Sequence, residues 1–247
     1  MLLSTRGIVF RTVKYGETSV IADIYTEEKG LHTFIAGAVR SAKSRMPFGL
    51  FQPMSVVEMV SYFREDSNAL HRMKELRAGE VWRAIPFDLR RGAIALFMAE
   101  VCRKCIHEAE PHQDLFEFLL DNLRLLDAAE TPVANIHLHF LAHLPAFLGF
   151  QPEFETLDLD ENPQEMFFDL REGVFTASVP PHNAYAEPAE TAHLLALLQT
   201  PLGDCHEIAL DKTARKALLQ CLTQFYQQHV PSFDAINTPA ILELVMG

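Results

Sequence analysis

The sequence predicts an α+β protein, in which a small five-stranded β-barrel of the OB type is followed by an α-helical domain. The first 76 residues form short segments rich in Val, Ile, Phe and Thr, separated by turns that contain Gly. From Glu80 onward, apolar residues recur at every third or fourth position, which is the period of a helix. The chain has 247 residues, of which 49% are hydrophobic and 22% charged, enough for one large domain or two modest ones. We therefore expect an OB domain in residues 1–79 and a helical domain in residues 80–247.

Five β-strands are expected in the first domain. Tyr15-Gly16-Glu17 is a short Gly-containing loop between two β-prone segments, which is typical of a hairpin. A second turn ends at Gly30, and a long connection containing Gly and Pro follows the third strand. Short antiparallel strands with one long gap after the third are typical of an OB barrel. The expected strands are residues 7–14, 18–26, 31–36, 54–63 and 69–76.

Helices are expected after the barrel. Asp88 is a typical N-cap residue, and the helix that it starts has one apolar stripe formed by Ile94, Met98, Val101 and Cys105. The later helices are expected in residues 114–127, 131–148, 189–198, 211–229 and 239–246.

Residues 151–186 lose the helical period. Several prolines and acidic residues surround one expected hairpin there, which pairs residues 166–169 with residues 174–177. We therefore expect an irregular insertion within the helical domain.

Charge divides the chain unevenly. The net charge is −12, but residues 1–83 carry 12 Lys and Arg against 9 Asp and Glu, whereas residues 84–247 carry 9 against 24. Phosphate binding depends mainly on Lys and Arg. A polyanionic partner is therefore expected to bind the first domain, and the second is expected to avoid it.

The sequence favours a cytoplasmic protein. No apolar run approaches the roughly 18 residues that a membrane span needs. The N-terminal residues lack a basic region followed by an apolar run, so we expect no signal or transit peptide. Four cysteines do not make a disulfide framework, which is consistent with a reducing compartment.

We expect no enzymatic activity and no cofactor. The chain has no P-loop, no Gly-x-Gly-x-x-Gly after a strand, no Gly-x-Ser-x-Gly and no His-Glu-x-x-His. Its carboxylates are scattered, and no pair is fixed by local spacing for acid–base chemistry.

Two clusters have spacings that metal ligands use. Cys102 and Cys105 lack a second cysteine pair, and Cys105 falls on an apolar helical stripe, so we expect buried thiols. His137, His139 and His143 have no Cys or carboxylate among them, so we expect ordinary core or surface histidines. No metal site is predicted.

The most informative segment is the basic loop, which we define as residues 37–45. It has three cations within six residues, spaced by Ser and Ala, and no acidic residue follows it before Glu58. Guanidinium and ammonium groups pair with phosphate oxygens, and small residues let a backbone approach closely. Further cations lie on the first expected strand, and aromatic rings on which bases could stack lie nearby. The candidate DNA-binding residues are Arg40, Lys43, Arg45, Arg6, Arg11, Lys14 and Tyr15, with Phe48 as a second ring. A solvated charge run, and aromatic residues in the core or at a hinge, are the alternatives.

Several motifs together resemble those of one bacterial family. They are residues 7–11, residues 13–18 (Val-Lys-Tyr-Gly-Glu-Thr), Gly30-Leu31, the basic loop, Phe51-Gln52-Pro53 and residues 147–152 (Phe-Leu-Gly-Phe-Gln-Pro). On these motifs the chain resembles the RecO family of recombination-mediator and DNA-repair proteins. The resemblance covers essentially the whole chain, with its specific motifs in the first third.

The resemblance implies a non-enzymatic role in recombinational repair. RecO proteins bind single- and double-stranded DNA, anneal complementary strands, and work with RecR to load RecA on DNA coated by single-strand binding protein. The OB barrel and its basic loop would hold DNA. The helical domain would contact proteins, including the acidic, hydrophobic-ended tail of the single-strand binding protein. RecF is a further partner that the resemblance suggests, and a nucleoid-associated location follows from it.

One departure from the family pattern concerns zinc. Many RecO proteins carry two cysteine pairs after the Leu-Gly-Phe motif, whereas residues 153–188 of this chain contain no cysteine. We therefore expect residues 151–186 to form a metal-free remnant of a zinc ribbon, held by Phe167, Phe168 and Phe175.

A second class of function stays open at this point. The excess of cations in the barrel is small, so the chain could be a protein-interaction scaffold in a repair complex with little direct DNA contact. The dependence of DNA affinity on salt distinguishes the two.

Overall fold

The computed structural model describes residues 1–39, 46–64, 70–154 and 165–231, and single residues 233, 236, 238, 241 and 242. The chain divides into two compact units, Met1–Ala128 and Ala129–Gly247.

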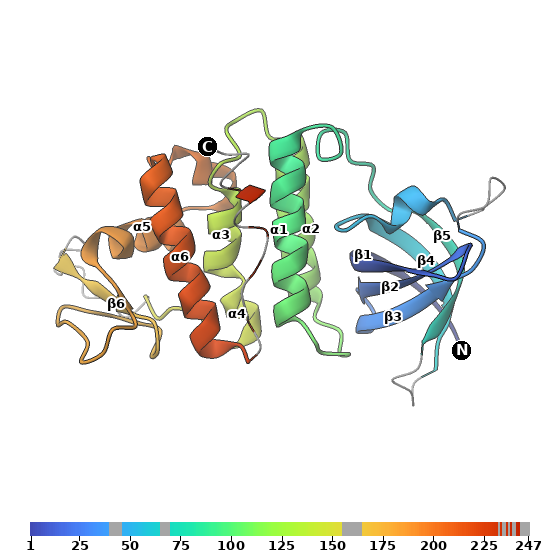
Figure 1. Ribbon diagram of the computed structural model, residues 1–247, viewed down its shortest axis with the longest axis horizontal. Helices are drawn as coiled ribbons and strands as arrows, with labels where there is room; N and C mark the ends of the chain where they lie inside the picture. Colours follow the sequence, from blue (N-terminus) through green and yellow to red (C-terminus); the bar gives the residue numbers. More distant parts are fainter. Residues whose placement is uncertain are drawn as a thin grey trace. The chain divides into compact units, whose positions relative to one another are not determined.

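The first unit contains a closed five-stranded barrel (Figure 1). Its strands are β1 (Leu2–Tyr15), β2 (Ser19–Thr26), β3 (Gly30–Ala36), β4 (Val56–Tyr62) and β5 (His71–Ala78). They close in the order β1-β2-β3-β5-β4, with β3 and β5 parallel and every other pair antiparallel. This is the predicted OB-type barrel, and its position before the helices confirms the predicted α+β class.

Strand β1 is longer than the sequence pattern predicts. Leu2 to Ile8 pair with β4, and Gly7 to Tyr15 pair with β2, so one strand serves both neighbours. The predicted start at residue 7 is wrong because residues 2–6 become a strand by pairing with β4, which lies more than 50 positions away in the sequence. Local alternation carries no signal for such a partner.

Two helices complete the first unit, α1 (Leu89–Cys105) and α2 (Gln113–Ala128). Asp88 caps α1 as predicted, because its side chain accepts hydrogen bonds from the backbone N–H groups of Arg90 and Arg91. Ile94, Met98 and Val101 are fully buried, as their spacing predicts.

The connection between α1 and α2 lies directly on the barrel. The backbone N–H of Leu31 donates to Glu108 O at 3.0 Å. Gly30 has φ +69°, and a Cβ at this position would lie 2.3 Å from Glu110 O, so only glycine fits. The Tyr25 ring stacks between Phe10 and Phe116. The start of α2 therefore covers the β1–β2–β3 side of the barrel.

The segment between β5 and α1 is held at several points. Trp82 Nε1–H donates to Met54 O at 3.0 Å. The Asp127 carboxylate accepts from the backbone N–H groups of Arg83, Ala84 and Ile85. These bonds fasten the segment to the barrel at one end and to α2 at the other.

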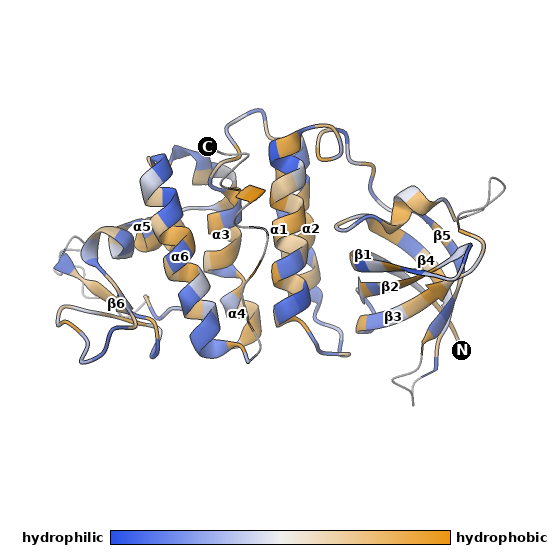
Figure 2. Ribbon diagram, viewed as in Figure 1, coloured by the Kyte–Doolittle hydropathy of each residue, from blue (hydrophilic) through white to orange (hydrophobic). Residues whose placement is uncertain are grey.

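Helices α3 to α6 and a small sheet make up most of the described part of the second unit. The helices are α3 (Ile136–His143), α4 (Pro145–Leu148), α5 (Pro188–Gln199) and α6 (Lys212–His229). Apolar and polar residues alternate along α6 (Figure 2), and its buried positions include Leu218, Leu222 and Phe225. Asp211 caps α6 by accepting from the N–H of Ala214.

The sheet of the second unit has the order β7-β6-β8, from β6 (Phe167–Asp169), β7 (Val174–Thr176) and β8 (Tyr185–Ala186). The β6–β7 hairpin confirms the predicted pairing of these segments. Phe168 packs on Phe175, with ring centroids 4.8 Å apart, and Phe167 contacts Tyr185.

The predicted helix over residues 131–148 is wrong at its start. The helical residues begin at Ile136, because the Asn135 side chain donates hydrogen bonds to Cys205 O and Ile208 O and fixes the chain there. The predicted last helix, residues 239–246, falls mostly outside the described residues. No helix within the described ranges is both long and apolar enough to span a bilayer.

Candidate nucleic-acid interface

The cations of the basic loop, Arg40, Lys43 and Arg45, lie outside the described residues. The residues on either side are described. Val39 is buried in the barrel core, and Met46 packs against the same core. The described residues on both sides of these cations are therefore anchored in the barrel core.

A groove of about 1110 Å³ lies at the base of this loop. Gly37, Ala38 and Met46 line it from the loop side, and the start of β1, the end of β4 and the start of β5 line the rest. Among the described residues that line it, the cations are Arg64, Arg72 and Lys74, and none is Asp or Glu. Such a groove attracts an anionic chain, because cations outnumber carboxylates among the described residues that line it. We call it the basic groove.

The register of the barrel places an aromatic ring beside a cation in the groove. Tyr62 of β4 pairs with Leu2 of β1 on one side and with Arg72 of β5 on the other. Residues directly opposite in neighbouring strands point to the same face of the sheet. Tyr62 is 52% exposed and Leu2 is 54% exposed. The exposed Tyr62 ring is therefore available for a base to stack on, within reach of a guanidinium group.

An aromatic cluster forms the floor of the basic groove. His71 is 2% exposed and stacks on Phe63, with ring centroids 4.3 Å apart. Burial lowers the pKa of His71, and the charges of His32 and Arg64 lower it further. The ring is therefore neutral near pH 7, and the positive charge of the groove comes from Arg64, Arg72 and Lys74.

The β1–β2 hairpin carries three of the predicted DNA-binding residues, Arg11, Lys14 and Tyr15. Tyr15 is 54% exposed, and Arg11 Nη1 lies 4.0 Å from Asp23 Oδ2. Lys14 forms no ion pair with any residue in the described ranges. A Cβ on Gly37 would lie 3.9 Å from Ser19 Oγ, so the hairpin end adjoins the strand that leads into the basic loop. Phe48, in a 3-10 helix after the loop, is 43% exposed.

Arg6, the remaining predicted residue, makes intramolecular contacts. Its Nη2 lies 2.6 Å from Glu27 Oε1 and 2.6 Å from Glu117 Oε1, and its guanidinium lies 5.1 Å from the centre of the Phe116 ring. The hydrogen bond from Arg6 lowers the pKa of Glu27. Arg6 thus joins β1 to the β2–β3 turn and to α2.

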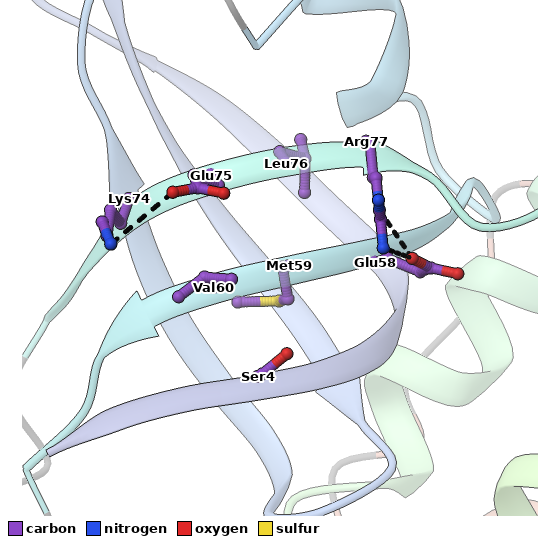
Figure 3. A pocket seen from close by; sticks show the side chains of 8 residues that line it. All are labelled: Ser4, Glu58, Met59, Val60, Lys74, Glu75, Leu76 and Arg77. Atoms are coloured by element: carbon purple, nitrogen blue, oxygen red, sulfur yellow. Dashed lines mark hydrogen bonds and ion pairs between the residues drawn. The ribbon is translucent and has the colours of Figure 1, made fainter.

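A second pocket, of about 670 Å³, lies beside the basic groove on β1, β4 and β5 (Figure 3). The two share Lys74. Here the cations are paired with acids. Arg77 Nη2 lies 2.6 Å from Glu58 Oε2, and Lys74 Nζ lies 3.6 Å from Glu75 Oε1. We call this the paired pocket.

The residues with metal-ligand spacing have structural contacts. Cys102 is buried on α1, and burial raises the pKa of Cys105 to about 12. The rings of His139 and His143 stack 4.1 Å apart, and their Nε2 atoms bond to Thr200 O and Leu197 O. In the described ranges, no three His, Cys, Asp or Glu side chains meet as metal ligands would.

The ribbon-like insertion lacks the cysteines that a zinc ribbon uses, and its described polar side chains make other contacts. Its segment has no cysteine, and Asp169 Oδ2 instead bonds to His182 Nε2 at 3.1 Å. Asp169 Oδ1 accepts from the backbone N–H groups of Arg171 and Glu172 in the turn between β6 and β7.

Sequence reasoning missed Tyr62, Arg64, Arg72 and Lys74. Arg72 and Lys74 are two positions apart in an expected strand, so the pattern places them on one face of it. The pattern does not show that this face meets Leu2 and the basic loop, because that follows from closure of the barrel through the β1–β4 and β3–β5 pairs.

Comparison with known proteins agrees with this architecture. Residues 1–80 match the family model described as Recombination protein O N terminal, and residues 86–234 match Recombination protein O C terminal. The chain is 33% identical over 244 residues to the DNA repair protein RecO of Bacteroides fragilis, covering 98% of each chain. It is 32% identical over 243 residues to that of Phocaeicola vulgatus, again covering 98% of each, and 29% identical over 250 residues to that of Flavobacterium psychrophilum, covering 100% of each. Both halves of the chain, barrel and helices, are thus shared with these proteins, and the chain belongs to the RecO family of DNA repair proteins.

Proposed function

We propose that this protein binds DNA through the basic groove and the segments beside it, and anneals complementary strands as a recombination mediator without catalytic activity. The DNA track consists of the basic groove, the basic loop and the end of the β1–β2 hairpin. The proposed contacts to phosphate are Arg64, Arg72, Lys74, Arg40, Lys43, Arg45, Arg11 and Lys14, and the proposed stacking residues are Tyr62 and Tyr15.

The observation that carries this proposal is a groove whose described lining holds Arg64, Arg72 and Lys74, and no Asp or Glu, around the exposed Tyr62. A cationic groove neutralises phosphates whatever the base sequence, and an exposed ring stacks on any unpaired base. This combination favours single strands, because the bases of a duplex are already stacked on each other. Duplex DNA still contacts the same cations through its backbone.

Annealing follows from the same surface. Two DNA strands repel each other, so they meet more readily where cations reduce their charge. We leave Arg6 out of the proposed track, because its guanidinium group already pairs with Glu27 and Glu117.

The helical region is proposed to serve protein partners. Residues 84–247 carry 24 Asp and Glu against 9 Lys and Arg, which repels phosphate. The partners that family membership suggests are RecR, the tail of the single-strand binding protein, RecF and, indirectly, RecA, with the protein acting at the nucleoid.

The test compares two double variants of the full chain. Arg64→Ala/Arg72→Ala removes two cations from the groove, and Arg83→Ala/Arg90→Ala removes two exposed cations outside it. We expect the groove variant to lose roughly tenfold or more in affinity for a labelled single strand and to anneal complementary oligonucleotides more slowly. The control variant should retain both activities. Equal behaviour of the two variants would favour the scaffold function with little direct DNA contact.

A further inference from the structure

The basic groove and the paired pocket lie end to end on one face of the barrel. Successive outward positions of β4 are Tyr62, Val60 and Glu58, and the register places Arg72, Glu75 and Arg77 of β5 opposite them. Lys74 lines both pockets. A DNA strand that follows β4 from Tyr62 past Lys74 therefore reaches the paired pocket next.

The basic groove and the paired pocket differ in how their cations are paired with acids. Of the three groove cations, Lys74 has Glu75 at 3.6 Å, whereas Arg64 and Arg72 form no ion pair with any residue in the described ranges. In the paired pocket the Glu58 carboxylate receives both Nε and Nη2 of Arg77, each at 2.6 Å (Figure 3). Arg77 is otherwise open to solvent, since its side chain is 81% exposed.

We propose that Glu58 is an electrostatic stop that ends the DNA track at Lys74 by holding Arg77 away from phosphate. This inference rests on the proposed function of the basic groove. An exposed ion pair is weak, so phosphate could compete for Arg77. Such a phosphate would then lie beside the released Glu58 carboxylate, and the repulsion between the two anions would cancel the gain. Arg77 is thereby a cation on the DNA-binding face that does not contribute to binding.

Glu58 thereby limits the length of single-stranded DNA that the protein covers. With Glu58 neutralised, Arg77 becomes free to pair with phosphate, and the track extends by one contact along β4 and β5. A contact to single-stranded DNA changes the slope of log affinity against log salt concentration by roughly 0.7.

The experiment measures this slope, and the shortest oligothymidine that reaches full affinity, for the full chain and its variants. Glu58→Gln keeps the shape of the side chain and removes its charge. We expect it to steepen the slope by roughly 0.7 and to lengthen the shortest full-affinity oligonucleotide. Glu28→Gln is the matched control, because it removes one charge from an exposed residue in the turn between β2 and β3 that lines neither pocket. It should leave both quantities unchanged.

Two further variants decide whether Arg77 is the cation released. Arg77→Ala alone should keep the parent slope, and Glu58→Gln/Arg77→Ala should return to it. A flatter slope for Arg77→Ala would show that Arg77 already contacts DNA and would overturn the proposal, as would no change for Glu58→Gln. The salt slope of Arg72→Ala is measured in the same experiment. If replacing Arg72 leaves the slope unchanged, the proposed function of the basic groove fails, and not only the role of Glu58.

Discussion

Tyr62 on β4 stands directly opposite Arg72 on β5, and both side chains lie in the groove at the base of the basic loop. The ring proposed to stack on a base and the guanidinium group proposed to pair with the adjoining phosphate are thus held by one register pair. Because strand pairing fixes the spacing, neither residue depends on the loop for its position.

Replacing Tyr62 distinguishes the contribution of base stacking to DNA affinity from that of the cations. We expect Tyr62→Ala to weaken binding of single-stranded DNA by about tenfold, within the range of about 1–3 kcal/mol for one stacked base. Binding of duplex DNA and the salt slope should hardly change, and Tyr62→Phe should bind as the parent does. Phe87→Ala is the control, since Phe87 is 86% exposed and lies outside the groove. Equal losses for single-stranded and duplex DNA would argue against stacking. Fluorescence anisotropy with both DNA forms provides the comparison.

The basic loop is tested by removing its three cations together. If Arg40, Lys43 and Arg45 each neutralise a phosphate, replacing all three with Ala should flatten the salt slope for single strands by roughly two units. The thermal midpoint should stay within a degree or two, because exposed cations contribute little to folding. Arg83, Arg90 and Arg103 are exposed cations outside the track, and their triple Ala variant is the control. An unaltered slope for the loop variant would remove the loop from the track and leave the basic groove and the hairpin.

The sequence predicted the barrel well but did not predict the basic groove. Alternation and turns identify all five strands, because each strand has a local pattern of apolar residues and a turn that ends it. The first half of β1 and the β3–β5 closure depend on partners distant in the sequence. The groove exists only after closure, when Leu2, Tyr62 and Arg72 become neighbours, so its aromatic residue carried no local signal.

Arg6 illustrates the opposite case. Its charge and its position in a β-strand favoured a DNA contact, and the sequence held no sign that Glu27 and Glu117 would converge on it. A single cation in a sequence does not show whether its partner will be phosphate or carboxylate. The cluster of three cations in the basic loop is a different signal, because no acidic residue occurs within the loop to pair with them.

Arg6 is expected to act on stability and not on DNA binding. Arg6→Ala should lower the free energy of unfolding by about 1 kcal/mol, since it breaks two ion pairs and the contact with the Phe116 ring at a partly exposed site. Because the pKa of Glu27 is lowered in the folded protein, this contribution is present above the ordinary pKa of a glutamate and is lost as the pH falls through the lowered value. Urea unfolding at pH 7 and at pH 3 measures both effects. A flattened salt slope in Arg6→Ala would instead place Arg6 in the DNA track.

Buried histidines should make the second unit sensitive to acid. Burial lowers the pKa of His137 to about 3 and that of His139 to about 4. The unfolded chain therefore binds protons more readily than the folded one between pH 6.5 and these values, and stability falls as the pH falls through that window. Each histidine contributes a loss of up to about 1.4 kcal/mol per pH unit. His139→Gln, which keeps a donor for Thr200 O, should reduce the pH dependence of the thermal midpoint. Parallel curves for the parent and His139→Gln would refute this assignment.

The most direct test of DNA binding by the basic groove is a salt titration of single-stranded DNA affinity, comparing the parent with Arg64→Ala/Arg72→Ala. We predict a steep negative slope for the parent and a slope flatter by roughly 1.4 units for the variant, corresponding to two lost phosphate contacts. Identical slopes in a variant with the same thermal midpoint as the parent would contradict the account, because the groove would then contribute no phosphate contact.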